Sequence, residues 1–193
     1  MHSTSIVEAQ YRQLVDVVAV LEKEIPVITA AADLIVHVLE AGGKVLTAGN
    51  GGSAAEALHM SEELIGRYRT NRRSLPSVCL ASDATALTCI GNDFGYDRIF
   101  SRQLEGLGRP GDVLVLFTTS GNSQNLLLAA DMAREKGMKV ITFIGGNGGK
   151  LKGLADVEWI VPSDRGPRVQ ELHNWAMHCI MEVVEERFPM AAS

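Results

Sequence analysis

The sequence predicts an α/β protein with a doubly wound, flavodoxin-like sheet of five parallel strands and an N-terminal helical hairpin. Two blocks of helical periodicity fill residues 5–41. After Gly43, short β-branched and aliphatic runs alternate with longer helical segments, the pattern of a parallel sheet covered on both faces. The chain has 193 residues, 46% of them hydrophobic, and no repeat or linker. These values indicate a single domain over residues 1–193.

The two N-terminal blocks predict helices over residues 6–23 and 26–40. The second block opens with Pro26 and is followed by Gly42 and Gly43, which are common residues at helix starts and ends. Apolar residues on these helices exceed what one buried face needs. The residues that widen the stripe are Val7, Val15, Ile25, Val36 and Val38. Such an excess indicates a subunit interface within residues 5–41.

The alternating region predicts both the elements and their arrangement. Strands are expected at residues 44–48, 77–81, 113–118, 139–144 and 157–161, and helices at 54–66, 84–90, 97–107, 123–137 and 167–187. In the strand order 2-1-3-4-5, the first and third strands are neighbours. The gap between their carboxyl ends is then the topological switch point, where ligands bind in such sheets.

Composition excludes several classes of protein. The net charge of −5 argues against a general nucleic-acid or anionic membrane surface. The three cysteines, Cys79, Cys89 and Cys179, show no C-x-x-C spacing and indicate a reduced, cytoplasmic protein. The N-terminus lacks the pattern of a signal peptide, and no apolar run approaches the ~20 residues of a membrane span.

Two loops at the expected switch point carry residues suited to binding phosphate. Residues 49–53 read Gly-Asn-Gly-Gly-Ser, and residues 118–123 read Thr-Thr-Ser-Gly-Asn-Ser, each between a strand and a helix. Glycine lets backbone N–H groups approach an anion, and hydroxyls add donors. Each loop alone could be a turn with a helix cap. A dinucleotide site is disfavoured because Asp83 follows Gly49 by 34 residues, instead of roughly 20.

Further candidates lie on the helices. His59 and Glu63 share one helix face, and Gln170 and His178 share a face of the last helix. Imidazole, carboxylate and amide oxygens would suit a divalent ion such as zinc, although a surface pair is the commoner explanation of such spacing. The residues alone therefore indicate a phosphate-binding α/β domain with candidate acid/base or metal-binding groups.

Several motifs resemble the sugar isomerase (SIS) domain family, and within it the isomerases of sedoheptulose 7-phosphate. They are residues 48–59 and 62–69, Gly91–Tyr96, Ile99–Arg102, Thr119–Ser123, Arg134–Lys139, and Val169–His173 with His178. The likeness covers about residues 10–188. It implies a homotetrameric cytoplasmic enzyme that interconverts D-sedoheptulose 7-phosphate and D-glycero-D-manno-heptose 7-phosphate, the first step of activated heptose biosynthesis for bacterial surface polysaccharide.

The resemblance also implies roles for particular residues. The substrate-binding residues would be Asn50, Gly51, Gly52, Ser53, Glu63, Asn92, Asp93, Thr118, Thr119, Ser120, Ser123 and Gln170. One zinc ion per subunit would be bound by His59, Glu63, Gln170 and His178, with Glu63 and His178 also acting as the acid/base pair. One departure is Thr118, where many members carry serine, so a methyl group is added beside the hydroxyl.

These residue types match the chemistry of aldose–ketose isomerisation. The reaction moves a proton between C1 and C2 through a cis-enediol, which requires a base, an acid and a group that stabilises the enediolate. Two alternatives are a non-catalytic SIS protein that binds the replication initiator and a sensor of a sugar phosphate. The presence of both Glu63 and His178 favours the enzyme.

Overall fold

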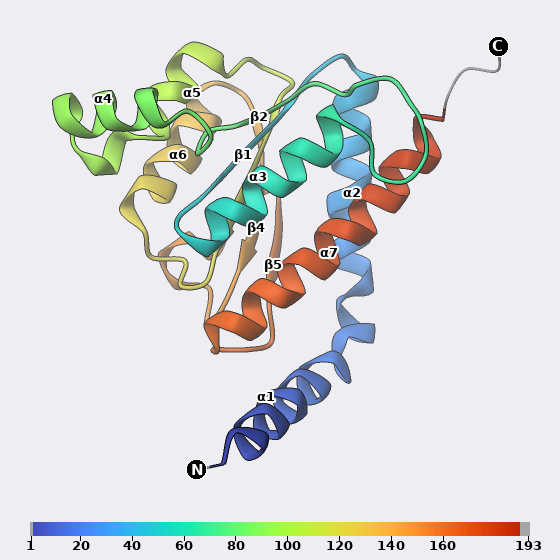
Figure 1. Ribbon diagram of the computed structural model, residues 1–193. Helices are drawn as coiled ribbons and strands as arrows, with labels where there is room; N and C mark the ends of the chain where they lie inside the picture. Colours follow the sequence, from blue (N-terminus) through green and yellow to red (C-terminus); the bar gives the residue numbers. More distant parts are fainter. Residues whose placement is uncertain (1, 190–193) are drawn as a thin grey trace.

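The computed structural model describes residues 2–189 and shows a three-layer α/β/α arrangement (Figure 1). Residue 1 and residues 190–193, the two ends of the predicted 1–193 domain, lie outside the described residues. The strands are β1 Val45–Gly49, β2 Ser77–Cys79, β3 Val113–Thr118, β4 Lys139–Ile144 and β5 Val157–Ile160. All neighbours pair in parallel in the order β2-β1-β3-β4-β5, which confirms the predicted topology.

Helices cover both faces of this sheet. They are α2 Ile25–Glu40, α3 Gly52–Ile65, α4 Ala84–Phe94, α5 Ser101–Leu107, α6 Gln124–Glu135 and α7 Gly166–Arg187. Alternate residues of β3 divide between the faces: Val115 and Phe117 pack in the apolar cluster formed with α2, α3 and α7, and Leu114 and Leu116 pack in the cluster formed with α5 and α6. Strands buried on both faces explain the nearly continuous apolar runs in the sequence.

The predicted N-terminal helices are confirmed, but they do not form a hairpin. Helix α1 Ser3–Val18 projects from the body of the molecule, and α2 continues from it after the 3-10 helix η1 Leu21–Glu24 (Figure 1). The connection does not reverse direction because Ala19 and Val20 keep right-handed helical dihedral angles. The middle of α1 is instead attached to α7, where Arg168 Nη1 donates a hydrogen bond of 2.8 Å to the carbonyl oxygen of Gln10.

The apolar excess of this region divides into two groups. Val36 and Val38 are buried and belong to the core, so their assignment to an interface was wrong. Val7, Val15 and Ile25 are exposed, as expected of residues available for a subunit contact. None of the described helices is long and apolar enough to cross a membrane.

Two further helical segments differ clearly from the prediction, and strand β2 ends at Cys79 rather than at residue 81. Helix α4 continues to Phe94 rather than ending at residue 90, so Asn92 and Asp93 lie on a helix and not in a turn. The predicted helix at 97–107 is divided into the 3-10 helix η2 Tyr96–Arg98 and α5. The break between η2 and α5 lies at Ile99 and Phe100, whereas Gly95, whose φ of +87° lies in a region that residues with side chains rarely adopt, separates α4 from η2.

Candidate functional site

The two predicted loops meet at the carboxyl ends of β1 and β3. Their closest link is a reciprocal amide pair between Asn50 of the first loop and Asn125 of α6, with both N···O distances 2.9 Å. The hydroxyl of Tyr96 donates a further hydrogen bond of 3.0 Å to Asn50 Oδ1. Sequence reasoning missed Asn125 and Tyr96. A usable signal was available for Asn125, because it occupies the first turn of the helix that follows the hydroxyl loop.

The helices that leave these loops lack side-chain caps. The residue before α3 is Gly51, which has no side chain that could cap the helix. The residue before α6 is Ser123, whose side chain makes no capping hydrogen bond to α6. Helix α4 is different, because Asp83 accepts hydrogen bonds from the N–H groups of Thr85 and Ala86. Uncapped first-turn N–H groups and the helix dipole favour an anion at this position. Both loops are therefore turns, but neither supplies a side-chain cap to the helix that follows it.

The hydroxyl loop has a defined internal structure. Thr118 is buried, and its Oγ1 accepts a hydrogen bond of 3.1 Å from the Gly121 N–H, so Thr118 shapes the turn. Thr119 and Ser123 are half-buried, and Ser120 is exposed. Gly121 has a φ of +65°, and a Cβ placed there would lie 2.0 Å from the carbonyl oxygen of Gly148. Glycine is therefore required where the loop after β4 supports the hydroxyl loop.

Gln170 lies against the first loop. A Cβ added to Gly52 would be 2.2 Å from Gln170 Nε2, so the glycine makes room for this amide. Gly52 precedes His59 by seven residues, which is about 10 Å along helix α3. Within one chain, Gln170 is consequently closer to the loops than to His59.

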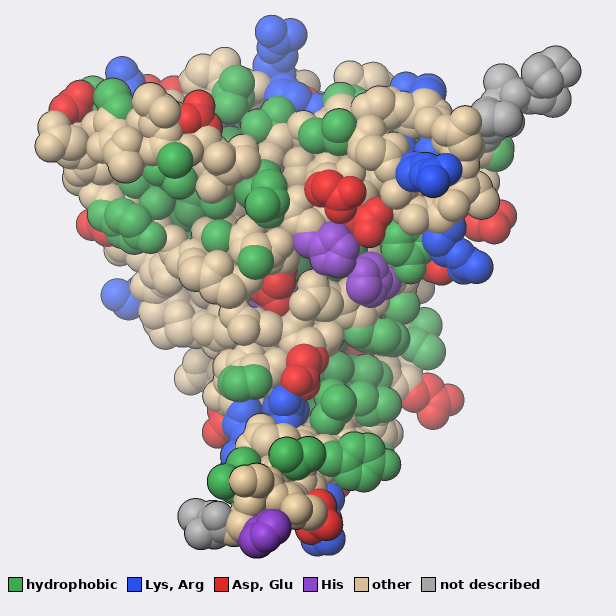
Figure 2. Space-filling model, in the orientation of Figure 1, with side chains coloured by type: hydrophobic (Ala, Val, Ile, Leu, Met, Phe, Trp, Pro, Cys, Tyr) green, Lys and Arg blue, Asp and Glu red, His purple; other side chains and the backbone are tan. Residues whose placement is uncertain are grey.

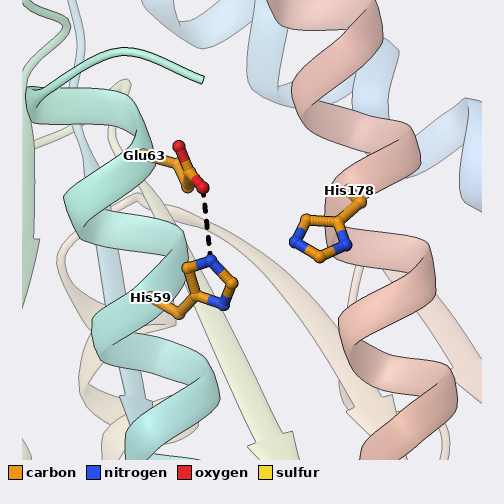
Figure 3. A group of neighbouring side chains, drawn as sticks. All are labelled: His59, Glu63 and His178. Carbon is orange, nitrogen blue, oxygen red and sulfur yellow. Dashed lines mark hydrogen bonds and ion pairs between the residues drawn. The ribbon is translucent and has the colours of Figure 1, made fainter. Parts of the chain in front are cut away.

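His59, Glu63 and His178 form a compact group between α3 and α7 (Figure 3). One donor atom from each side chain lies within 4.8 Å of the other two. His59 Nε2 and Glu63 Oε1 are 3.2 Å apart, and the ring centroids of His59 and His178 are separated by 5.2 Å. All three side chains are half-buried, and Figure 2 shows two histidines beside acidic side chains on this face.

A tyrosine that sequence reasoning did not assign packs beside this group. The ring centroid of Tyr68 lies 5.8 Å from that of His178. Burial, followed by the charge of Glu182 and a hydrogen bond to it, raises the pKa of the Tyr68 hydroxyl. The phenol is thus neutral at physiological pH and can fix the orientation of the His178 ring.

Two buried charges hold the segment 66–76, which carries Tyr68. Arg72 donates hydrogen bonds to the carbonyl oxygens of Glu63 and Leu64 at the end of α3, and burial lowers its pKa. Glu185 of α7 accepts hydrogen bonds of 3.0 Å from the N–H groups of Arg69 and Thr70. Burial opposes the ionisation of Glu185, but these hydrogen bonds and the nearby arginines lower its pKa overall.

Asn92 and Asp93 are not brought to the histidines within one chain. Both are exposed on the last turn of α4, where Asn92 Nδ2 donates a hydrogen bond of 2.8 Å to Asp93 Oδ1. Helix α4 packs in the apolar cluster on the face of the sheet opposite α7. The structure therefore brings together His59, Glu63 and His178, and it brings Gln170 to Gly52 of the first loop.

These features define a class: a doubly wound α/β domain with two loop-to-helix junctions that lack side-chain caps at its switch point, and a His/Glu/His group between α3 and α7. Residues 10–145 match the SIS domain family. The chain is 46% identical to a phosphoheptose isomerase of Geobacter sp. (strain M21) over 180 residues, covering 93% of this chain and 94% of that one. It is 50% identical to a phosphoheptose isomerase of Enterobacter sp. (strain 638) over 166 residues, covering 86% of each chain.

Solved structures agree with this relationship. A phosphoheptose isomerase from Francisella tularensis superposes with a TM-score of 0.93 at 35% identity, covering 96% of this chain and 100% of that chain. A phosphoheptose isomerase from Neisseria gonorrhoeae gives a TM-score of 0.89 at 38% identity with the same coverage. The chain belongs to the SIS domain family, in its phosphoheptose isomerase branch, and is an isomerase.

Proposed function

We propose that this isomerase interconverts D-sedoheptulose 7-phosphate and D-glycero-D-manno-heptose 7-phosphate, the first step of activated heptose biosynthesis. One observation carries the proposal: an acid/base-capable group, His59, Glu63 and His178, lies on α3, the helix that leaves the first loop, and on α7, which packs against α3. The high identity to phosphoheptose isomerases over almost the whole chain supports the choice of substrate.

The substrate phosphate is expected at the hydroxyl loop, held by Thr119, Ser120 and Ser123 around the turn shaped by Thr118. The first loop would contact the sugar through Asn50, Gly51, Gly52 and Ser53, with Gln170 beside it. Gripping the phosphate away from the reacting carbons uses binding energy to position C1 and C2.

Glu63 is proposed as the base and His178 as the acid. Starting from the ketose, the Glu63 carboxylate removes a proton from C1, while His178 donates a proton to the oxygen on C2. The resulting enediol becomes the aldose when Glu63 delivers its proton to C2 and the C1 hydroxyl gives its proton to His178. Their donor atoms lie within 4.8 Å of each other, so both can reach adjacent carbons of one substrate.

The same side chains fit a divalent metal ion, for which we propose zinc. Two imidazoles and a carboxylate are typical zinc ligands, and three protein ligands with an open position are typical of catalytic zinc sites. Gln170 is the proposed fourth ligand, although its amide lies at Gly52 in this structure. Bound zinc would supply a Lewis acid that stabilises the enediolate oxygens.

Metal removal tests this assignment. Chelation should lower kcat at least about tenfold, because several kcal/mol of charge stabilisation would be lost, and added zinc should restore it. Metal analysis of the active protein before and after chelation provides the stoichiometry. Full turnover in protein shown to contain no divalent ion would leave these residues with acid/base roles only.

We further propose that residues 1–193 form one SIS domain and that the protein is a cytoplasmic homotetramer. The exposed apolar residues Ile6, Val7, Tyr11 and Val15 on α1 support a subunit contact through this helix. Asn92 and Asp93, exposed on α4, would then contact substrate bound to a neighbouring subunit. An active monomer in light scattering at micromolar concentration would contradict the assembly.

The assay that tests the function uses purified protein and D-sedoheptulose 7-phosphate, with the heptose phosphate product followed by chromatography. The proposed enzyme forms the aldose until equilibrium is reached. A sensor of sugar phosphates would bind the ketose without forming product, and a protein that binds the replication initiator would have no requirement for Glu63 or His178. Binding without turnover would therefore decide against catalysis.

A further inference from the structure

A buried ionisable pair joins α3 to α7 beneath the site. Glu56 Oε2 and His173 Nδ1 lie 3.3 Å apart, although 117 positions separate them in the sequence. Their side chains are 4% and 0% exposed, respectively. The two helices run side by side (Figure 1). The pair is thus a polar contact in the interior of the interface between the helices that carry Glu63 and His178.

The surroundings of the pair are apolar. The centroid of the His173 ring lies 5.8 Å from that of Phe117, 6.1 Å from Phe143 and 6.2 Å from Trp159. Among the described residues, Glu56 Oε1 and His173 Nε2 have no hydrogen-bond partner. A buried polar pair that is only partly satisfied contributes little to stability, because removing both groups from water costs as much as their attraction returns. A contribution to stability therefore does not explain why Glu56 and His173 are paired here.

The position of the pair suggests its role. Contacts between α3 and α7 follow one another along both helices: Gly52 meets Gln170, Glu56 meets His173, and His59 meets His178. Successive contacts are separated by about one helical turn. A hydrogen bond is directional, so the middle contact specifies one longitudinal position of α7 against α3 more strictly than apolar packing does.

We infer that Glu56 and His173 are positioning residues whose hydrogen bond fixes α7 against α3, and so sets the separation of Glu63 and His178. This inference rests on the function proposed for that site. A misplacement of about 1 Å between reacting groups can reduce turnover by about 100-fold, so a small slide of one helix is enough to matter. Neither residue has to touch the substrate.

Replacing Glu56 tests the inference. Glu56→Leu should lower kcat and zinc affinity each by at least about tenfold, while KM changes by less than about threefold because both phosphate-binding loops remain intact. Glu56→Gln keeps a hydrogen-bonding group of the same size and should retain most of the wild-type kcat and zinc affinity. Zinc affinity is measured by calorimetric titration of the metal-free protein, independently of turnover.

Ser61→Ala is the matched control on α3. The buried Ser61 hydroxyl shares a hydrogen bond of 3.0 Å with Ser77 Oγ of β2, so its loss removes a buried polar contact that does not reach α7. Its kcat and zinc affinity should equal those of the wild type. Wild-type values in Glu56→Leu, or equal losses in Ser61→Ala, would overturn the inference.

The double variant Glu56→Leu/His173→Phe separates positioning from stability. It leaves neither polar group unpaired, so its Tm should equal or exceed that of the wild type. Its kcat and zinc affinity should nevertheless stay low, because the directional contact is gone. A folded double variant with wild-type kcat and zinc affinity would overturn the inference. A double variant that does not fold would show that the pair is an ordinary part of the core, and would overturn it too.

Failure of the proposed function would be recognised separately. Wild-type protein that does not convert D-sedoheptulose 7-phosphate would contradict the proposed reaction. The comparison of zinc affinity among the wild type, Glu56→Leu and Ser61→Ala would still show whether the pair positions the two helices.

Discussion

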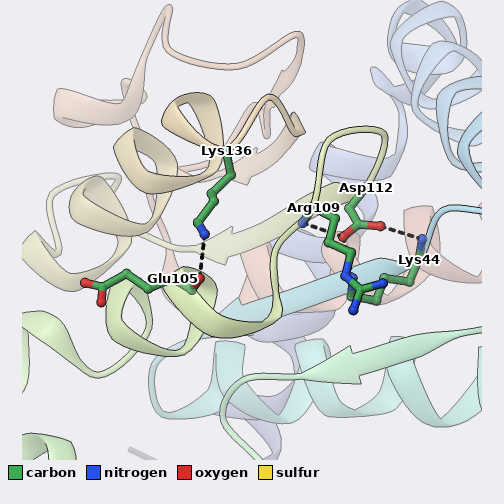
Figure 4. Close-up of polar contacts among 5 residues, drawn as sticks. All are labelled: Lys44, Glu105, Arg109, Asp112 and Lys136. Atoms are coloured by element: carbon green, nitrogen blue, oxygen red, sulfur yellow. Dashed lines mark hydrogen bonds and ion pairs between the residues drawn. The ribbon is translucent and has the colours of Figure 1, made fainter.

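The two ends of the sheet use their polar side chains differently. At the amino ends, Asp112 before β3 accepts hydrogen bonds from the N–H groups of Lys44 and Arg109 at 3.0 and 2.9 Å, and also pairs with the Lys44 ammonium group (Figure 4). Asp156 before β5 likewise accepts from the N–H of Val140 at 2.8 Å and from Lys139 Nζ at 2.7 Å. At the carboxyl ends lie the hydroxyl loop and the starts of two helices without side-chain caps.

This difference separates stability from function. An acidic group with several donors around it ties neighbouring strands together and has little capacity left for a ligand. Helix N-termini without capping side chains contribute less to stability but can bind an anion. Substitutions at the carboxyl ends should therefore change kinetics with little effect on unfolding, and substitutions at the amino ends should do the opposite.

The largest expected effect belongs to Glu63→Gln in the group formed with His59 and His178. This variant keeps the size of the side chain and an oxygen atom but removes the basic carboxylate. We expect kcat to fall about 100-fold or more, with KM changed much less, because the phosphate is bound elsewhere. Exchange of the substrate's carbon-bound proton with solvent deuterium should fall in parallel.

Glu62→Gln is the control, because Glu62 is the exposed neighbour on the same helix and should be dispensable. A Glu63→Gln variant with near-wild-type isomerisation and solvent exchange would mean that another group is the base.

A smaller kinetic effect is expected for Thr119→Val in the hydroxyl loop. The substitution preserves the shape of the side chain and removes one donor to the phosphate. Because a hydrogen bond to a charged group contributes roughly 1.5–3 kcal/mol, KM should rise on the order of tenfold while kcat stays within about twofold. Thr29→Val, on the exposed face of α2, is the matched control. A loss confined to kcat would place Thr119 at the reacting carbons instead of the phosphate.

The sequence allowed the sheet to be predicted more fully than the site. Strands β3 and β4 match their predicted ranges residue by residue, because a doubly buried strand is marked by a continuous apolar run. The prediction of a hairpin after α1 was wrong, because helical periodicity reveals a helix but not the angle at which the next helix leaves it. Pairs such as Glu56 and His173 could not be found either, since 117 positions separate them and only tertiary packing joins them.

The two loops at the switch point were predicted less completely than the strands but better than the contacts between helices. Residues 50–53 and 118–123 were recognised because glycine and hydroxyl residues follow strands at the switch point, and both loops lie there. The inward role of Thr118 was not predictable, because a hydroxyl that shapes a turn and one that contacts a ligand look the same in sequence. The approach of Gln170 to Gly52 likewise depends on how α7 packs against α3.

The smallest expected effect concerns the amino end and is visible only in stability. Burial opposes the ionisation of Asp156, but hydrogen bonds from Lys139 and the Val140 N–H outweigh it and lower the pKa below the usual 3.8. A lowered pKa stabilises the folded state fully at pH values above the pKa of the unfolded state, and this contribution disappears as the pH falls through the pKa of the folded state.

Asp156→Asn should therefore lower the Tm at pH 7 by a few degrees, and the difference from wild type should shrink below about pH 3.8 in thermal melts. Asp131→Asn, at an exposed ion pair with Arg134, should show almost no difference at any pH. KM and kcat should be unchanged in both variants, and a kinetic defect in Asp156→Asn would break the division between the two ends of the sheet.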